Sequence, residues 1–169
     1  MIETESPILD KAKFLDWKEM YHNVWSQPES ARYMAWNITT SEEAARIRIV
    51  KTIAFQKEYD TYLVYEKSSG KAIGFAGVEK LEPHIYQEAG ICLGSDYIGK
   101  GFGKQILQGL IQYCKEQFGA KEFIYATRDE NTASNRLAKS CGFSLISSTT
   151  KTDSKDGHQY DLLRYKLKL

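Results

Sequence analysis

Apolar residues near the N-terminus recur at helical spacing. They lie at i, i+3, i+4, i+7 and i+8, which predicts a helix with one buried stripe: Trp17, Met20, Tyr21, Val24 and Trp25. A second helix is predicted from the capping pattern Thr40-Ser41-Glu42-Glu43 to about Tyr59. Ahead of both, Ile8-Leu9 indicates a short strand, and Pro7 restricts it to an edge or an end of a sheet.

From Thr61 onward the apolar pattern changes to a period of two, which is typical of strands. Residues 61–66 and 72–81 predict a hairpin, and Gly74 and Gly77 mark places of close backbone approach. Further strands are predicted over residues 87–93, 122–127, 143–148 and 160–168. Helices are predicted over 103–118, ending at the cap Gly119, and over 134–140.

This order of elements predicts an α+β fold, with one domain over residues 1–169 and a mixed sheet flanked by helices. The unit formed by strand 87–93, helix 103–118 and strand 122–127 is a crossover, so its two strands should be parallel. The N-terminus of that helix then lies at the carboxyl end of the first strand, where α/β sheets bind ligands.

The overall composition is that of a globular protein, with 42% hydrophobic and 27% charged residues and a net charge of +1. The near-neutral charge argues against a broad nucleic-acid surface. No apolar run has membrane-spanning length, and the acidic start, Ile2-Glu3-Thr4-Glu5, lacks a signal-peptide core. A cytoplasmic location is therefore expected.

The metal-ligating residue types show no pattern of a metal site. Cys92, Cys114 and Cys141 lie far apart without CxxC spacing, and they are interpreted as core residues in a reducing compartment. His22, His84 and His158 also lack ligand spacing, so surface or loop positions are expected for them.

A glycine-rich turn, residues 94–104, leads directly into the helix at 103. Glycines at 99, 101 and 103 leave backbone N–H groups accessible, and a helix N-terminus with Lys100 and Lys104 adds positive charge. The pattern therefore predicts a cradle for phosphate or pyrophosphate. It fits neither a Walker A loop, because Gly101 stands where a hydroxyl would bind Mg²⁺, nor the GxGxxG dinucleotide fingerprint. A phosphate-bearing ligand bound without a metal is expected.

Two segments resemble the GCN5-related N-acetyltransferases (GNAT): Gly99-Lys100-Gly101-Phe102-Gly103 after a strand, and Asn131-Thr132-Ala133-Ser134 ahead of Gly142-Phe143. The RimJ/RimL-type branch is the most similar, since Glu88-Ala89-Gly90-Ile91 also matches its "EIGY" strand. The resemblance extends over nearly the whole chain and implies acetyl-CoA as co-substrate.

The resemblance also implies how the co-substrate is bound. The parallel strands would splay apart to admit the pantetheine arm, which the backbone of Ile91, Cys92 and Leu93 would pair like an added strand. The backbone amides of Lys100, Gly101, Phe102, Gly103 and Lys104 would hold the pyrophosphate. Asn131 and Ser134 would line the thiol end.

Three departures from the family pattern bear on chemistry. Ile98 stands where relatives often place Arg or Gln, Ala138 where many have a tyrosine acid, and Ala126 where others have a glutamate base. The two alanines favour a runner-up function, a non-catalytic acyl-CoA-binding or regulatory module. A nucleotide-binding protein using the glycine loop is a more distant third.

Acetyl transfer requires the acceptor amine to be neutral, so a protonated amine must first lose its proton. A positioned carboxylate can accept that proton, directly or through water. Glu88 is the first candidate for this base, because it opens the strand beside the expected gap, and Glu79 is a weaker one. Ser134 either protonates the leaving thiolate or only caps a helix, and a backbone N–H near Leu93 is expected to meet the developing oxyanion.

Three aromatic residues are candidates for flanking the acceptor, but core packing is the favoured interpretation for each, because most aromatic side chains are buried: Tyr33, Trp36 and Tyr86. The sequence leaves open whether the acceptor is a protein N-terminus, an amino acid, a polyamine or a drug, and whether the protein is a monomer or a homodimer.

Overall fold

The computed structural model describes all 169 residues. Its eight strands form one sheet in the order β1-β2-β3-β4-β5-β6-β8-β7, in which only β5 and β6 are parallel. The strands are β1 (Ile2–Glu3), β2 (Pro7–Asp10), β3 (Thr61–Glu66), β4 (Ala72–Glu82), β5 (Ile85–Leu93), β6 (Glu122–Arg128), β7 (Ser144–Thr152) and β8 (Gln159–Lys168). The helices are α1 (Trp17–Met20), α2 (Pro28–Ala31), α3 (Glu42–Glu58), α4 (Phe102–Phe118) and α5 (Thr132–Ser140).

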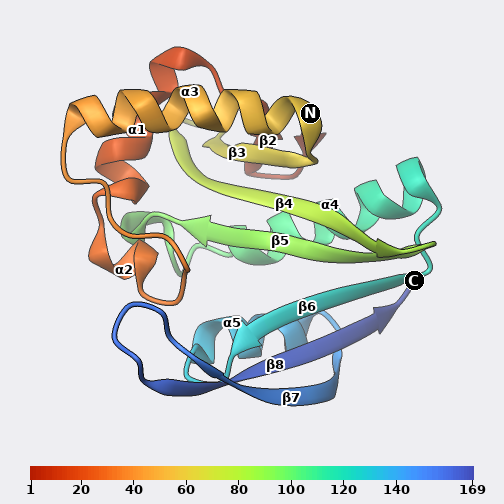
Figure 1. Ribbon diagram of the computed structural model, residues 1–169. Coiled ribbons are helices and arrows are strands. Elements are labelled where there is room, and N and C mark those ends of the chain that lie inside the picture. Colours follow the sequence, from red (N-terminus) through yellow and green to blue (C-terminus); the bar gives the residue numbers. More distant parts are fainter.

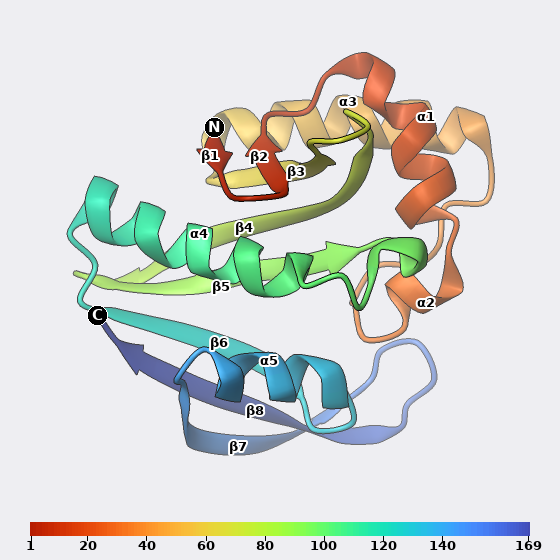
Figure 2. The ribbon, with the colours of Figure 1, turned by 180° about the vertical axis from the view of Figure 1, so that it is seen from behind.

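Helices cover both faces of this sheet, as the two opposite views show (Figures 1 and 2). The first predicted helix is α1 continued by a π-helical turn, Tyr21–Trp25. The second is α3, where the Ser41 hydroxyl accepts a hydrogen bond from the Ala44 N–H at 3.1 Å. The helix is confirmed, but its cap is Ser41 and not Thr40, the hydroxyl position of the predicted capping box, so the cap lies one residue later than predicted. The predicted α+β class with a mixed, mostly antiparallel sheet is also confirmed.

Two apolar clusters hold these layers together. The larger one packs α4 against the sheet and includes Ile106, Leu110, Phe123 and Tyr165. The smaller one packs α1, the π-helical turn and α3 against β3, β4 and β5. Only the larger cluster contains residues of β6 and β8. Apolar packing therefore connects β5 to β6 and β8 on the α4 face of the sheet but not on the α3 face.

The parallel pair β5–β6 is joined over only three residue pairs, Ile85↔Glu122, Tyr86↔Phe123 and Gln87↔Ile124. Beyond Gln87 the strands separate, and Figure 1 shows them diverging toward their arrowheads. This is the splay that the sequence resemblance implied. It leaves one backbone edge of β5, and the facing edge of β6, without a strand partner.

The limits of several elements differ from the sequence prediction by one to four residues, and two of these differences have a clear cause. α5 begins at Thr132, two residues earlier than predicted, because the Asn131 side chain caps it. β7 continues to Thr152 beyond the predicted end at 148, and all of its residues are exposed. An exposed strand gives no apolar alternation from which its end can be read. No helix is both long and apolar enough to span a membrane.

We predict that Gly74→Ala destabilises the fold by about 1–3 kcal/mol or more, because overpacking of a close contact forces the backbone to shift. A Cβ at Gly74 would overlap the carbonyl oxygen of Cys92 on β5. Denaturant unfolding followed by circular dichroism measures the loss. Gly103→Ala is the control, since its Cβ would lie 3.6 Å from Leu137 Cδ2, an ordinary contact. Equal stability of the two variants would contradict this account.

Candidate active site

A cavity of about 250 Å³ lies where β5 and β6 separate. Its walls come from β5, β6, the start of α5, β8 and the segment after α2. The lining residues include Glu88 and Ile91 of β5, Tyr125 of β6, Ser134 of α5, Tyr160 of β8 and residues 33–35 after α2. The structure therefore brings Glu88, Ile91, Asn131 and Ser134, all predicted as site residues, to one cavity.

The Glu88 carboxylate lies between the two diverging strands. Its Oε2 accepts a hydrogen bond from the Gly90 N–H at 2.6 Å, and its Oε1 accepts one from the Ala126 N–H of β6 at 3.4 Å. A bulge in β5 allows this, because the register against β4 shifts and Gly90 adopts a φ of +100°. Glu88 therefore occupies the gap itself instead of standing exposed at the strand end.

Burial raises the pKa of Glu88 to about 8, because the charged form loses its hydration. The two backbone N–H donors oppose this shift, since they stabilise the carboxylate. Glu88 is only 8% exposed. A carboxyl group that titrates near neutral pH is suited to accept a proton from a substrate.

A tyrosine that the sequence did not single out lies beside Glu88. The Tyr125 hydroxyl and the Ser134 Oγ are 2.7 Å apart, and both side chains line the cavity. Burial raises the pKa of Tyr125, and the negative charge of the nearby Glu88 carboxylate raises it further. The helix cap is Asn131, whose Oδ1 accepts from the Ser134 N–H at 3.2 Å. The capping role expected for Ser134 is therefore wrong, and its hydroxyl is bonded to Tyr125.

The glycine-rich turn presents a run of free donors. Six consecutive backbone N–H groups, from Gly99 to Lys104, make no hydrogen bond within the protein. Gly99 and Gly101 both adopt a φ of +80°, which turns the chain into α4. Exposed N–H groups at a helix N-terminus form a site for an anion, as the sequence predicted.

Five further residues that the sequence singled out do not line the cavity at the gap. The Tyr86 ring is buried and stacks on Phe118 at 5.1 Å, which confirms the favoured interpretation as core packing and not the alternative beside the acceptor. Trp36 lines a different cavity, under α3. Glu79 is exposed on β4 and accepts from Gln87 Nε2 at 3.1 Å, away from the gap. Cys92 and Leu93 continue β5 past the bulge, opposite Phe75 and Gly74 of β4.

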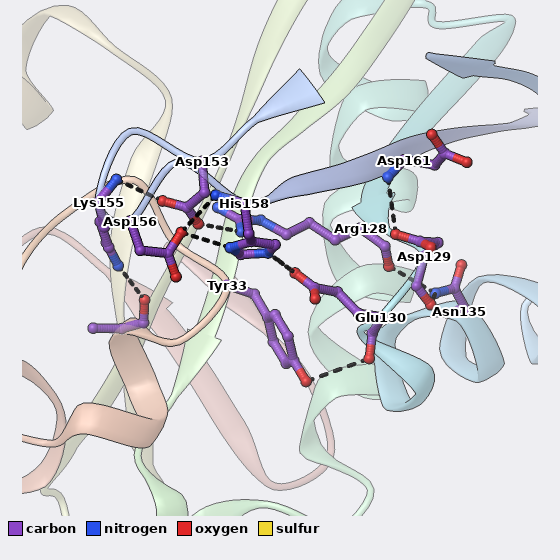
Figure 3. A network of polar contacts seen from close by, with 11 residues as sticks. Tyr33, Arg128, Asp129, Glu130, Asn135, Asp153, Lys155, Asp156, His158 and Asp161 are labelled. Atoms are coloured by element: carbon purple, nitrogen blue, oxygen red, sulfur yellow. Dashed lines mark hydrogen bonds and ion pairs between the residues drawn. The ribbon is translucent and has the colours of Figure 1, made fainter. Parts of the chain in front are cut away.

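A polar network beside the cavity ties the β7–β8 loop to the rest of the molecule (Figure 3). The buried Arg128 of β6 pairs with Asp153 of this loop, and its guanidinium also lies 3.9 Å from the Tyr160 ring centroid. Lys155 Nζ donates to the Ala31 carbonyl at 2.7 Å, which links the loop to α2. These contacts could not be predicted from the sequence, because the partners lie far apart along the chain.

His158 lies in the same network, 2.6 Å from Asp156 and 3.1 Å from Glu130 through its two ring nitrogens. These carboxylates, Asp156 first, raise its pKa because they stabilise the imidazolium. Asp153, Asp156 and His158 lie close enough together to hold a metal ion. Arg128 and the Lys155 N–H already occupy Asp153, however, so the group is an internally satisfied cluster.

Residues 8–144 match the family model described as "Acetyltransferase (GNAT) domain". The chain belongs to the GNAT acetyltransferase family. It is 25% identical over 146 residues to an uncharacterised N-acetyltransferase p20 of Bacillus licheniformis, covering 85% of this chain and 82% of that protein. It is 29% identical over 138 residues to the L-methionine sulfoximine/L-methionine sulfone acetyltransferase of Pseudomonas aeruginosa, covering 79% and 78%.

Solved GNAT structures share the fold of this chain. A GNAT-family acetyltransferase from Bacillus anthracis superposes with a TM-score of 0.84 at 20% identity, covering 99% of this chain and 97% of that one. The microcin C7 self-immunity acetyltransferase MccE, solved with acetyl-CoA and AMP, gives 0.82 at 22% identity, covering 98% and 93%. A Salmonella typhimurium enzyme that modifies the N-terminal serine of ribosomal protein L7/L12 gives 0.79 at 20%, covering 98% and 96%. This GNAT chain is therefore an acetyltransferase, and RimL-type enzymes are among its structural neighbours.

The raised pKa of Glu88 predicts a pH-dependent gain in stability for Glu88→Gln. Between the ordinary pKa of 4.5 and about 8, the unfolded chain loses the proton at this position while the folded chain retains it. Wild-type stability should therefore fall through this window. A glutamine cannot ionise, so the melting temperature of the variant relative to wild type should rise from pH 5 to pH 8.5.

Differential scanning fluorimetry across this pH range measures the difference. Glu82→Gln, which removes an exposed carboxylate from β4 that is not among the groups acting on the pKa of Glu88, should show no such trend. A flat difference for Glu88→Gln would mean that the buried carboxyl group titrates normally.

Proposed function

We propose that this protein is a cytoplasmic, metal-independent N-acetyltransferase that moves the acetyl group of acetyl-CoA directly to a primary amine. The acceptor is a protein N-terminus or a small-molecule amine. The observation that carries the proposal is the buried Glu88 carboxylate in a gap between parallel strands, next to a run of six free backbone N–H groups.

The glycine-rich turn fits a pyrophosphate. Free N–H groups of Gly99 to Lys104 supply donors in one direction, and Lys100 and Lys104 add positive charge. The unpaired edge of β5 at Ile91, Cys92 and Leu93 suits the amides of a pantetheine arm, which would bind as an added strand. These residues would hold acetyl-CoA with its acyl end near Glu88 and Ser134.

Glu88 would act as the base. The attacking nitrogen must be neutral, and an α-amine with a pKa of about 7.7–8.0 is close in acidity to a carboxyl group at about 8. A matched pKa lets Glu88 take the amine proton, directly or through water, as the C–N bond forms and the thioester C–S bond breaks. A backbone N–H near Leu93 would stabilise the intermediate oxyanion.

The departing thiolate needs a proton or a hydrogen bond. Ser134 and Tyr125 form a hydroxyl pair beside Glu88, 2.7 Å apart. Ser134 would donate to the sulfur while Tyr125 holds its orientation. Because Tyr125 comes from β6, it places a phenol in the cavity although Ala138 occupies the position of the family's usual tyrosine.

The names of two relatives support an acceptor with a primary amine, and they include both a small-molecule and a protein acceptor. The Pseudomonas aeruginosa relative is named for two amino acid derivatives, and the Salmonella typhimurium structure for a protein N-terminal serine. Both groups of acceptors carry a primary amine. Thiol release from acetyl-CoA, scanned across peptides, amino acids and polyamines, tests the proposed activity.

A negative charge at the glycine-rich turn should weaken acetyl-CoA binding at least about tenfold, through repulsion of the pyrophosphate. Gly103→Asp places that charge in the first turn of α4, where an acidic residue favours the helix dipole and leaves the fold stable. Titration calorimetry with acetyl-CoA measures the affinity, and Gly103→Asn is the uncharged control of the same shape.

Gly101→Asp should weaken binding as well, with added strain from its φ of +80°. Lys104→Ala should have a smaller effect, since an exposed charge is one of several anion contacts. Unchanged affinity in both aspartate variants would remove the turn from the binding site.

Replacing Glu88 by glutamine should lower kcat by about 10²–10⁴, the range for loss of a general base. Acetyl-CoA affinity should persist, because the amide has nearly the same shape. The rise of the wild-type rate through about pH 8 should disappear if Glu88 sets it. Glu82→Gln, an exposed carboxylate of β4 outside the gap cavity, is the matched control and should retain the wild-type rate. Equal rates for wild type and Glu88→Gln from pH 6 to 9 would exclude Glu88 as the base.

A further inference from the structure

A second cavity of about 410 Å³ lies between α3 and the sheet, on the face opposite α4. Its walls include Trp36, Phe75 and Ala89. Ala89 stands in β5 between Glu88 and Gly90, which line the gap cavity, and Trp36 follows Ala35, which also lines that cavity. The second cavity is therefore next to the proposed site of acetyl transfer.

The side of α3 that faces this cavity is unusually polar for a helix packed on a sheet. The residues at i, i+3, i+4, i+7 and i+8 line it: Arg48, Lys51, Thr52, Phe55 and Gln56. Ile47 and Val50 of the same helix are 53% and 54% exposed. A helix that packs only for stability places its apolar stripe inward. Here, polar groups and open volume occupy part of the inward side, at some cost to packing.

Arg48 carries a positive charge without an anionic partner. Its guanidinium carbon lies 4.6 Å from the ring centroids of both Trp25 and Trp36, which hold it in place. Its only side-chain hydrogen bond goes to Thr39 Oγ1 at 3.0 Å, and none of the ion pairs in the protein includes it. Burial lowers the pKa of Arg48 to about 10, so it stays charged at neutral pH. A half-buried guanidinium retains donors for a carboxylate.

Other polar groups of the same walls also lack partners. Only three buried side-chain polar atoms in the protein have no hydrogen bond, and two of them, Trp36 Nε1 and Thr61 Oγ1, belong to residues lining this cavity. Both atoms have almost no accessible surface, so the groups that can donate into the cavity are the Arg48 guanidinium and the Lys51 ammonium, which only donate. The wall thus supplies hydrogen-bond donors and positive charge but no carboxylate.

We propose that this cavity binds the acceptor, and that the acceptor is a small amino carboxylate whose carboxylate pairs with Arg48 and whose apolar body packs against the wall formed by Trp36 and Phe75, whose rings contact each other edge to face. The inference rests on the proposed acetyl transfer and specifies its substrate class. The amine of such a molecule would point toward Glu88 past Ala89.

The dimensions and lining of the cavity favour this class over others. A volume of about 410 Å³ is that of a small-molecule pocket. Its aromatic walls suit an apolar body, and one planar guanidinium matches one carboxylate bidentately. A polyamine, in contrast, would bring positive charge toward Arg48 and Lys51.

Matched acceptors that differ only in charge test the proposal. L-Phenylalanine, L-methionine and 5-aminopentanoate are compared with their carboxamides by thiol release, each kcat/KM being corrected for the fraction of neutral amine. At least one of the three pairs should show a preference for the acid of about tenfold or more in the wild-type protein, the range expected for a charge-assisted hydrogen bond. The α- and ω-amino acids report how far the carboxylate lies from the amine.

The acid-to-amide ratio should fall toward one in Arg48→Gln and take an intermediate value in Arg48→Lys, which keeps the charge but loses the planar fork. A ratio within one variant is insensitive to partial unfolding. Arg46→Gln is the matched control, because Arg46 lies on the same helix but pairs with Glu42 at 3.2 Å outside the cavity. Its ratio should equal that of wild type.

A wild-type ratio near one for all three pairs, or a ratio that Arg48→Gln leaves unchanged, would overturn the proposal. Acetylation of a peptide N-terminus but of none of these acids would also overturn it while leaving the acetyltransferase function intact. Calorimetric binding of the same pairs in the presence of coenzyme A gives a readout without turnover. Acid-selective binding that needs Arg48, without acetyl transfer to any amine, would support the cavity and contradict the proposed function.

Discussion

The short hydrogen-bonded ladder between β5 and β6 is the constraint on which the proposed site depends. Three residue pairs join the strands before they separate, and backbone groups left inside a protein require partners. Glu88 supplies one of them by accepting the Ala126 N–H across the gap. The same placement buries the carboxyl group and raises its pKa to about 8. Strand separation and a basic carboxylate thus have one structural origin.

The sequence predicted features that local chemistry determines and missed those that depend on three-dimensional packing. The glycine-rich turn and Glu88 were identifiable because turn geometry and strand position are local properties, whereas Ser134 was named through the family resemblance. Tyr125 was not identifiable, since a tyrosine within a buried strand has the same pattern as a core residue. The pairing of Arg128 with Asp153 joins a strand to a distant loop. The two interpretations of Tyr86 stayed open because the pattern does not give the face of the sheet on which an aromatic ring lies.

The departures from the family pattern have a structural counterpart. Ala126, at a position where other members place a glutamate, contributes its backbone N–H to Glu88. Ala138 lies on the fully buried face of α5, while Tyr125 brings a phenol to Ser134 from β6. Polar groups can therefore occupy the site although the usual side chains are absent, and the two alanines alone are weak grounds for expecting a non-catalytic module.

The two faces of the divided sheet are bridged by different forces. On the α4 face, one apolar cluster extends across the gap and contains Phe123 and Tyr165. On the other face the apolar cluster ends at β5, and polar contacts such as Lys155 to Ala31 and Tyr33 to Glu130 span the distance. The contacts cited on this face are hydrogen bonds to backbone carbonyls and not ion pairs. Because a single hydrogen bond of this kind contributes only about 0.5–1.5 kcal/mol net, local opening of the gap would begin on this face, while the apolar cluster keeps the α4 face closed.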